Sequence, residues 1–449
     1  MRGAAGTMRL KRLPDARALA RRRRRLMSRM GSRDVVLLSS APETFHSNDV
    51  EHRYRPDSDL FYLTGFSEPG AVAVLAPGHP HGDFWLVVRP RDPGKEAWTG
   101  PRAGVQGARE IYGARMARPL AALPEVVEEV LDRAATLYHM PGRDPALDTL
   151  LRRLLSRRRR NRRRIPRALS DVRPLVHEMR LKKEQDELAH MRRAAAITCR
   201  AHREGMALAA PGLYEYQVEA RIDCVFRTLG AQGVAYPTIV GSGPNGVILH
   251  HVDNQRRLRR GDLVLVDAGC ECHCYAADVT RTFPVDGRFR PPQRRLYDLV
   301  LAAQQAAMGE VRAGVSMDRP HQAAVEILAQ GLVDLGILPG TPRDVVAGKT
   351  YLPFFMHRTS HWLGLDVHDV GGRTRHGRPR RLASGMVLTV EPGLYIRADA
   401  AGVPAAYRGL GIRIEDDLLV TAAGHEVLTG DLPRTAAAIE RACRRAPRL

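Results

Sequence analysis

The sequence is poor in aromatic residues and has no long hydrophobic run. Aromatic residues make up 5% of the 449 positions, too few to build the stacking platform on which single-stranded nucleic acid is bound. No apolar run reaches the length of about 18 residues that a membrane-spanning helix needs. Because hydrophobic residues make up 44% and charged residues 27% of the chain, we expect a soluble globular protein with about two or three domains.

Cysteine is also scarce. Six cysteines in a chain of this length are too few and too unevenly spaced for a disulfide framework, and a reducing, cytoplasmic setting is the simplest expectation. Three of them, Cys270, Cys272 and Cys274, fall in one short segment. Their one-residue gaps are tighter than those of structural zinc sites, so we expect free thiols in a loop.

The positive charge of the chain comes almost entirely from arginine. Only five of the 70 basic residues are lysine, and the net charge is +21. A charge of this size is typical of proteins that bind nucleic acid or anionic membranes. No aromatic residue interrupts the arginine-rich stretches 21–25 and 157–164, however. We therefore expect these stretches on solvated faces, without a nucleic-acid or membrane partner.

The N-terminal segment is basic but has no apolar core followed by a small-residue cleavage site, so we expect no secretory signal. Its arginine-rich, acid-poor start is also similar to a mitochondrial transit peptide, which stays open as an alternative. Translation starts at either Met1 or Met8.

The order of predicted elements indicates two α/β domains. Apolar runs between Pro and Gly predict strands over 35–38, 71–75, 84–88, 263–266, 279–285, 386–390 and 412–420. Apolar residues at helical intervals predict helices over 10–30, at both ends of 120–163, and over 181–206, 215–229, 294–312 and 320–335. We place the boundary just past the second arginine-rich stretch, giving an N-terminal domain of residues 1–173 and a C-terminal domain of residues 174–449.

Five residues that can bind metal ions stand at predicted strand ends or turns. They are Asp267, Asp278, His361, Glu391 and Glu415. Any one of these acids could be an ordinary ion-pair or turn residue. A hairpin would bring Asp267 and Asp278 together, however, and converging carboxylates repel one another unless cations neutralise them. Four carboxylates and one imidazole exceed the needs of one tetrahedral zinc, so we expect two divalent ions bridged by carboxylates and a hydroxide.

Arg413 and the histidines are candidates for supporting roles. Arg413 is two residues from Glu415 on one predicted strand and would face the same side, where it either orients a metal-bound carboxylate or makes a plain ion pair. Histidines concentrate in the C-terminal half, at His250, His251, His357, His361 and His368. A neutral histidine beside a metal centre can stabilise an oxyanion or transfer a proton, although many histidines simply pack in a core.

Two known motifs are excluded. His357 and His361 are four residues apart but lack the glutamate of the His-Glu-x-x-His zinc proteases. Residues 241–246 fit the pattern G-x-G-x-x-G, but Pro244 lies inside it and residues 247–249 predict a strand. Since a dinucleotide site needs a helix there, nucleotide binding is disfavoured.

The segments around these residues resemble the bacterial Xaa-Pro aminopeptidases (aminopeptidase P) of the pita-bread metallopeptidase family. The resemblance covers nearly the whole chain, through segments 47–49, 54–66, 239–243, 278–284, 360–371, 389–395 and 411–417. It implies a small N-terminal α/β domain (RNase H-like) and a C-terminal pita-bread (creatinase/aminopeptidase) domain. It also implies two divalent ions, with Mn²⁺ expected and Zn²⁺ or Co²⁺ as alternatives. The implied reaction is hydrolysis of the bond between an N-terminal residue and a following proline.

The resemblance also implies roles for single residues. His250, His357 and His368 match active-site histidines, Glu391 accepts a proton, and Arg413 and Tyr395 are their partners. His250, His368 and Trp98 would bind substrate, Trp98 being supplied by a neighbouring subunit in tetrameric members. We accordingly expect a homo-oligomer, a dimer or a tetramer.

The sequence departs from the family at the cysteine-rich segment, at His251 in place of a more typical aromatic residue, and in its arginine content. Three alternatives stay open: a dipeptide-specific prolidase, a creatine hydrolase, and a metal-free module that binds nucleic acid or protein.

Overall fold

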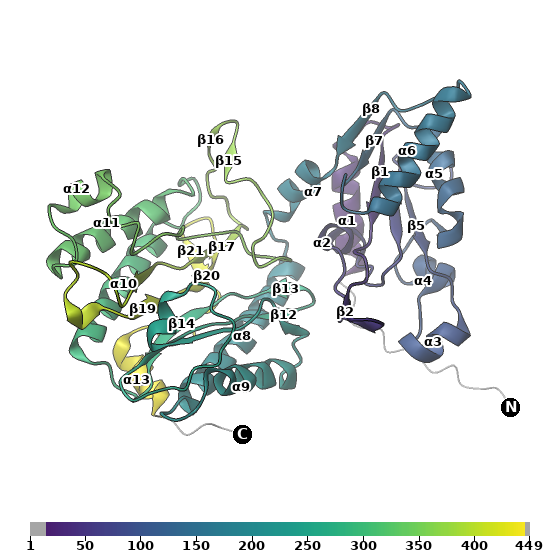
Figure 1. Ribbon diagram of the computed structural model, residues 1–449. Helices are drawn as coiled ribbons and strands as arrows, with labels where there is room; N and C mark the ends of the chain where they lie inside the picture. Colours follow the sequence, from purple (N-terminus) through teal and green to yellow (C-terminus); the bar gives the residue numbers. More distant parts are fainter. Residues whose placement is uncertain (1–14, 445–449) are drawn as a thin grey trace. The chain divides into compact units, whose positions relative to one another are not determined.

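The computed structural model describes residues 15–444, which divide into two compact units after Met179. Figure 1 shows the chain coloured from purple at the N-terminus to yellow at the C-terminus. The boundary predicted from the sequence, after residue 173, lies slightly earlier, at the first residue of helix α7 (Arg173–Arg180).

The first unit is built on one six-stranded mixed sheet in the order β6-β5-β4-β1-β7-β8. Its strands are β1 (Val35–Ser39), β4 (Val72–Leu75), β5 (Phe84–Val88), β6 (Met116–Pro119), β7 (Thr136–His139) and β8 (Ala168–Asp171), beside a small hairpin of β2 (Phe45–Ser47) and β3 (Val50–Glu51). Its helices are α1 (Ala16–Met27), α2 (Ser58–Thr64), α3 (Pro93–Thr99), α4 (Gly104–Glu110), the short η1 (Leu120–Ala122), α5 (Leu123–Leu131) and α6 (Pro145–Arg160).

The predicted strands of this unit are present because each is a run of apolar residues whose side chains are buried on both faces of the sheet. Helices α5 and α6 cover one face and contribute Val127 and Leu151 to its core, while α1 and α2 lie on the other face (Figure 1). The sequence did not predict strand β7, between α5 and α6, or the strands β2, β3, β6 and β8. Of the predicted helix 10–30, residues 10–14 lie outside the described part of the chain.

The arginine-rich stretches are not wholly solvated, which corrects the expectation from the sequence. Arg22 is 1% exposed and Arg158 is 0% exposed. The guanidinium of Arg23 lies 4.0 Å from the ring centroid of Phe84 and donates to the Leu63 carbonyl at 2.9 Å, and that of Arg158 binds Glu128 and Asp132. In α1 the adjacent Arg22 and Arg23 both face inward, and in α6 Arg158 does so; a ring or a carboxylate receives each of them.

The second unit contains four small antiparallel sheets and a two-stranded hairpin. Its strands are β9 (Gly233–Val234), β10 (Ile239–Ser242), β11 (Leu263–Asp267), β12 (Cys270–Cys272), β13 (Tyr275–Ala276), β14 (Thr280–Pro284), β15 (Thr374–Arg375), β16 (Arg378–Pro379), β17 (Val387–Val390), β18 (Gly393–Ile396), β19 (Leu410–Arg413), β20 (Asp416–Val420) and β21 (His425–Val427). The sheets are β10-β11-β14, β13-β12-β9, β17-β20-β21, β18-β19 and the hairpin β15-β16.

Long helices surround these sheets, as Figure 1 shows for α8 and α10. They are α8 (Gln185–Leu208), α9 (Glu215–Thr228), α10 (Pro291–Gly309), α11 (Arg319–Asp334), α12 (Pro342–Ala347) and α13 (Ala436–Cys443), with two short helices, η2 (Gly243–Val247) and η3 (Ala405–Tyr407). One large apolar core joins the helices to the sheets. Within residues 15–444, no helix combines the length and apolar character needed to cross a membrane.

Three expectations for this unit are wrong in detail. The predicted strand 412–420 is two strands, β19 and β20, because β19 pairs with β18 whereas β20 pairs with β17. Val247 ends the short helix η2, and residues 248–249 after it form no strand. The cysteines are free, as expected, but Cys270 and Cys272 lie in strand β12, and all three thiols of the segment are buried.

Candidate metal centre

Strands β11 and β14 bring Asp267 and Asp278 together. Asp267 is the last residue of β11 and pairs with Thr280 of β14, and Asp278 lies two residues before Thr280. The Tyr236 hydroxyl lies 2.6 Å from Oδ1 of Asp267 and 2.5 Å from Oδ1 of Asp278. Both carboxyl groups therefore contact the same tyrosine hydroxyl. The sequence predicted that a hairpin would bring these two carboxylates together.

Glu391 and Glu415 stand where two paired strands pass from one sheet to the next. The chain leaves β17 at Val390, passes Glu391 and Pro392, and enters β18. Its antiparallel neighbour leaves β19 at Arg413 and enters β20 after Glu415. Both glutamates thus occupy breaks in the strand pairing, and both line the same cavity.

His361 faces the carboxylates with one ring nitrogen. Its Nδ1 lies 3.0 Å from the Trp362 carbonyl, which can only accept, so Nδ1 carries the proton. Its Nε2 lies 3.3 Å from Asp278 Oδ2 and 3.5 Å from Glu391 Oε1. Ligand atoms of Asp278, His361 and Glu415 all lie within 4.8 Å of one another.

Three of the four acids in this cluster have a raised pKa, because burial and mutual repulsion disfavour their charged forms. Burial raises the pKa of Glu391 to about 7, and neighbouring Asp278 adds to the shift although His361 opposes it. Burial and repulsion from Asp278 raise the pKa of Glu415 well above its usual range. Burial also raises the pKa of Asp267, against the opposing effect of Arg413.

Asp278 and His361 form the exception, because they stabilise each other as an ion pair. Burial alone would raise the pKa of Asp278, but the hydrogen bond and charge of His361 lower it. Burial likewise opposes the protonation of His361, yet Asp278 and Glu391 raise its pKa to about 9. The His361 imidazolium and the Arg413 guanidinium together carry two positive charges against four carboxylates, so the donor set fits divalent cations, which remove the remaining repulsion.

Arg413 fixes the orientation of the Asp267 carboxylate through a hydrogen bond. Its guanidinium donates to Asp267 Oδ2 at 2.6 Å, to the Thr280 hydroxyl at 3.0 Å and to the Tyr395 hydroxyl at 2.9 Å. The Thr280 hydroxyl in turn donates to Glu415 Oε2 at 2.7 Å. Arg413 ends β19 and Glu415 lies beyond it, so the two do not share one strand face as predicted, although both reach the cluster.

His357 makes hydrogen bonds through both of its ring nitrogens. Nδ1 lies 2.9 Å from the Arg358 carbonyl and Nε2 lies 2.8 Å from the Tyr395 hydroxyl. Since the carbonyl only accepts, Nδ1–H donates to it, and Nε2 accepts from Tyr395. Burial lowers the pKa of His357 to about 3, so the ring is neutral at neutral pH.

The cluster forms the floor of a cavity of about 550 Å³. His250 and His368 lie on its wall, and the rings of His368 and His361 are 4.5 Å apart. The wall also has an apolar part, formed by Ile239, Leu249, Val252 and Val367. A cavity with a charged floor and an apolar wall suits a ligand with both polar and apolar parts.

Two residues singled out in the sequence lie elsewhere. Trp98 is on α3 of the first unit and is 89% exposed, so its predicted role as a substrate contact supplied by another subunit stays a prediction. His251 does not line the cavity. Its Nε2 lies 3.1 Å from the buried Glu215 carboxylate, which also accepts from the backbone nitrogens of Ser242 and Arg256.

Sequence reasoning missed three side chains that touch the cluster. Tyr236 contacts both aspartates, Thr280 contacts Glu415, and Asp417 accepts from the Asp278 backbone nitrogen at 3.1 Å. Thr280 could have been found, because it stands two residues after Asp278 and residues two apart on a strand share one face. Asp417 shows the same spacing, two residues after Glu415, whereas Tyr236 carries no such pattern.

Comparisons with known proteins agree with this geometry. Residues 189–422 match the model of metallopeptidase family M24, and residues 19–138 match the N-terminal domain of aminopeptidase P. The chain is 44% identical to the Xaa-Pro aminopeptidase of Escherichia coli K12 over 94% of this chain and 96% of that protein. It is 41% identical to the Xaa-Pro aminopeptidase of Haemophilus influenzae over 93% and 95%.

Solved structures agree as well. An aminopeptidase of Pseudomonas aeruginosa superposes with a TM-score of 0.93 at 43% identity, covering 95% of this chain and 98% of that one. A zinc-substituted E. coli aminopeptidase P in complex with product gives 0.92 at 42% identity, with the same coverage. These matches confirm the predicted pair of α/β domains, the second with the pita-bread fold. The chain therefore belongs to metallopeptidase family M24 and carries the aminopeptidase P N-terminal domain ahead of its metallopeptidase domain.

Proposed function

We propose that this chain is a metal-dependent aminopeptidase that removes the N-terminal residue from peptides in which proline stands second. The observation that carries this proposal is the convergence of four acids and one histidine on the floor of a single cavity. The relatives named Xaa-Pro aminopeptidase, which the chain matches over nearly its full length, support the choice of substrate.

The metal ligands in this proposal are Asp267, Asp278, His361, Glu391 and Glu415. Bound divalent metals would supply Lewis-acid activation of water and of the scissile carbonyl. A set rich in oxygen ligands suits hard to borderline ions, and we propose Mn²⁺, with Zn²⁺ and Co²⁺ as alternatives.

Glu391 moves the proton in this mechanism. As a carboxylate on the cavity floor beside the bound metals, it would take a proton from the attacking water and later give it up. The nitrogen of an Xaa-Pro bond has no hydrogen, so it must receive a proton as the bond breaks. Glu391 would deliver that proton to the proline nitrogen.

The remaining residues position the substrate. His250 is free to donate to the developing oxyanion, whereas His357 already uses both ring nitrogens and instead holds the Tyr395 hydroxyl against Arg413. His368, on the cavity wall, would hold the part of the peptide beyond the proline. The apolar part of the cavity wall would receive the proline ring.

Substitution of the proton acceptor tests the proposal. In Glu391→Gln we expect Mn²⁺-dependent release of the first residue from an Xaa-Pro-Xaa peptide to fall by about 10²–10⁴-fold, because the amide cannot accept the proton. The matched control is Glu426→Gln, on the surface beside Arg192, which should keep full activity. Near-normal turnover in Glu391→Gln would reject the role.

The same assay tests the finer parts of the proposal. Faster cleavage of an Xaa-Pro dipeptide than of the tripeptide would identify a prolidase instead. Reconstitution of metal-depleted protein with Mn²⁺, Zn²⁺ or Co²⁺ ranks the metals. We also propose a homo-oligomer in which exposed Trp98 reaches a neighbouring cavity, and a cytoplasmic location, which the free cysteines support.

A further inference from the structure

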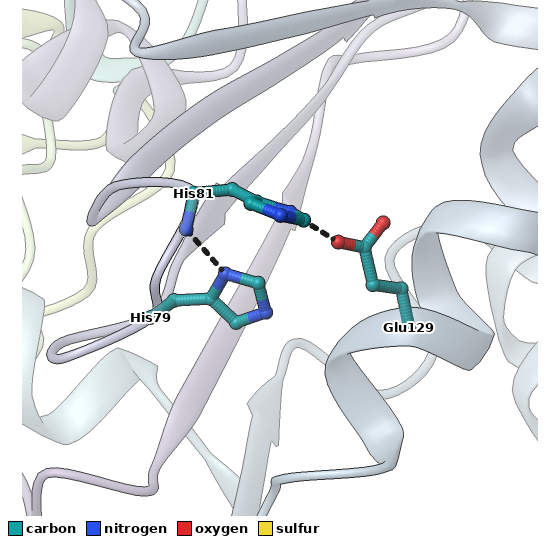
Figure 2. A group of neighbouring side chains, drawn as sticks. All are labelled: His79, His81 and Glu129. Carbon is teal, nitrogen blue, oxygen red and sulfur yellow. Dashed lines mark hydrogen bonds and ion pairs between the residues drawn. The ribbon is translucent and has the colours of Figure 1, made fainter.

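A second group of candidate metal ligands lies in the first unit, and none of its members lines the cavity. Figure 2 shows His79, His81 and Glu129 facing one another. The two histidines belong to the turn between β4 and β5, and Glu129 belongs to α5. Each residue offers one ligand atom, and these atoms all lie within 4.8 Å of one another.

The turn that carries the two histidines is tightly built. Gly78 and Gly82, which flank it, have φ values of 71° and 99°, a conformation that other residues adopt at a cost, and Pro80 restricts the backbone between the histidines. The Gly82 backbone nitrogen donates to the His79 carbonyl at 2.9 Å. Because the turn is already restrained, little conformational freedom is left to lose when a ligand binds.

Contacts also hold the three side chains in place. The His79 ring packs edge-on against Trp85, with ring centroids 4.5 Å apart, and its Nδ1 accepts from the His81 backbone nitrogen at 3.2 Å. His81 Nδ1 lies 2.8 Å from Glu129 Oε1 (Figure 2). The two imidazole rings are 5.4 Å apart, so small rotations would bring three donors around one ion.

The charges at this group permit cation binding. Burial lowers the pKa of His79; Glu129 opposes the shift, and His81 and Arg133 add to it. A neutral imidazole with a lone pair is the form that binds metal. Glu129 supplies the negative charge that attracts a metal ion. Arg133, four residues further along the chain, is a nearby positive charge that opposes cation binding.

The donor set points to a different metal from that of the cavity. Two imidazoles and one carboxylate are the set that zinc uses where one coordination position is left open. The His81 side chain is 58% exposed, so an ion can enter from solvent. We propose that His79, His81 and Glu129 bind one borderline transition-metal ion of the Zn²⁺ class and thereby tie the β4–β5 turn to α5.

The zinc content of the full-length chain tests this proposal. Because the cavity also holds metal, the informative quantity is the difference between variants after equilibrium dialysis against Zn²⁺. We expect His79→Ala/His81→Ala to hold one zinc fewer per chain than the wild type, and Glu129→Gln to hold its extra zinc more weakly. Peptidase activity should be unchanged in both variants, since neither alters the cavity.

The chain offers a matched control. His46 and His52 in the same unit also form a ring pair with centroids 5.4 Å apart, but they belong to no group of three ligands among the described residues. His46→Ala/His52→Ala should therefore keep the wild-type zinc content. Equal zinc in the wild type and in His79→Ala/His81→Ala, or an equal loss in the control, would overturn the proposal.

Tryptophan fluorescence gives a second measurement that reports on the site itself. Cu²⁺ bound beside His79 would quench Trp85, which packs against that ring. We expect a saturable part of the quenching to disappear in His79→Ala/His81→Ala and to persist in His46→Ala/His52→Ala. Quenching that is identical in all three proteins would contradict a site at this turn.

Discussion

At the scale of single residues, Arg413 links the metal ligands to the rest of the site. Its guanidinium reaches Asp267, Thr280 and Tyr395 at the same time. A lysine ammonium is a compact point charge and cannot reproduce this planar set of donors. The exact direction of the Asp267 carboxylate therefore depends on an arginine at this position.

We expect Arg413→Lys to weaken metal binding by about 10–100-fold, the usual effect of losing a partner that orients a metal ligand. The measurement is peptidase activity as a function of Mn²⁺ concentration, with kcat at saturating metal as a second readout. Arg192→Lys is the control, because Arg192 binds Glu426 through two nitrogens at the surface. An unchanged metal dependence in Arg413→Lys would refute this role.

The sequence predicted the acids of the site but not their hydroxyl partners. Asp267 and Glu391 stand out because each ends an apolar run, where a carboxylate is costly unless it is paired. A tyrosine such as Tyr236 carries no comparable signal, since tyrosine packs well with or without a hydrogen-bond partner. Its contact with both aspartates arises only from the folded arrangement of β10, β11 and β14.

At the scale of secondary structure, the break between β19 and β20 decides where Glu415 lies. Apolar residues stand at both ends of the segment 412–420, which led to the prediction of one continuous strand. The break is set by the partners instead: β18 and β17 are themselves separated at Glu391 and Pro392. A strand whose partner lies far along the chain cannot be divided correctly from its own composition.

Close packing of β19 against η2 gives a test at this scale. A Cβ added at Gly411 would lie 1.9 Å from the Gly246 carbonyl oxygen, so Gly411→Ala must push η2 away from β19. We expect a loss of about 1–3 kcal/mol in the free energy of unfolding, as for other overpacked sites, and a lower kcat/KM because η2 leads to His250.

Chemical denaturation and steady-state kinetics check this expectation. The control is Gly424→Ala, since a Cβ at Gly424 meets no atom within 4 Å. If both substitutions left stability and kcat/KM unchanged, the contact between η2 and β19 would not be as tight as described.

At the scale of the whole molecule, the sequence predicted the fold class, the long helices and the main buried strands, and it missed many short helices and strands. The α/β character of both units and the helices α8, α9, α10 and α11 follow from long periodic patterns, which are the strongest local signals. The division of the second unit into small separate sheets was not predictable, because each of these sheets forms between strands whose pairing depends on the completed fold.

The acids of the cluster should make the stability of the metal-depleted protein fall as pH rises. The folded protein raises the pKa of Glu391 from 4.5 to about 7, so it binds more protons than the unfolded chain between these values and loses stability as pH rises through them. His361, with its pKa raised to about 9, extends the loss to higher pH in the same direction.

Thermal unfolding with EDTA and with saturating Mn²⁺ between about pH 5 and pH 9 measures this effect, since the titrations of these two groups span that range. We expect the stabilisation by metal to grow with pH. We expect the Tm of the EDTA sample to fall from about pH 7 to pH 9, where histidines whose pKa burial lowers, such as His357, are neutral in both the folded and the unfolded state. Glu391→Gln should flatten the lower part of the EDTA curve. A Tm that rises with pH in EDTA over that upper range would show that the acids are not held in this mutually repulsive state.

The placement of Glu391 and Glu415 at two facing strand crossovers limits how such a chain can change over time. Side chains alternate across a strand, so inserting or deleting one residue in β17, β18, β19 or β20 would reverse the direction of a glutamate. Substitutions can accumulate along these strands, whereas changes in their length would remove a ligand outright. By contrast, the β12–β13 hairpin between Asp267 and Asp278 can vary in length without changing the register of β11 against β14.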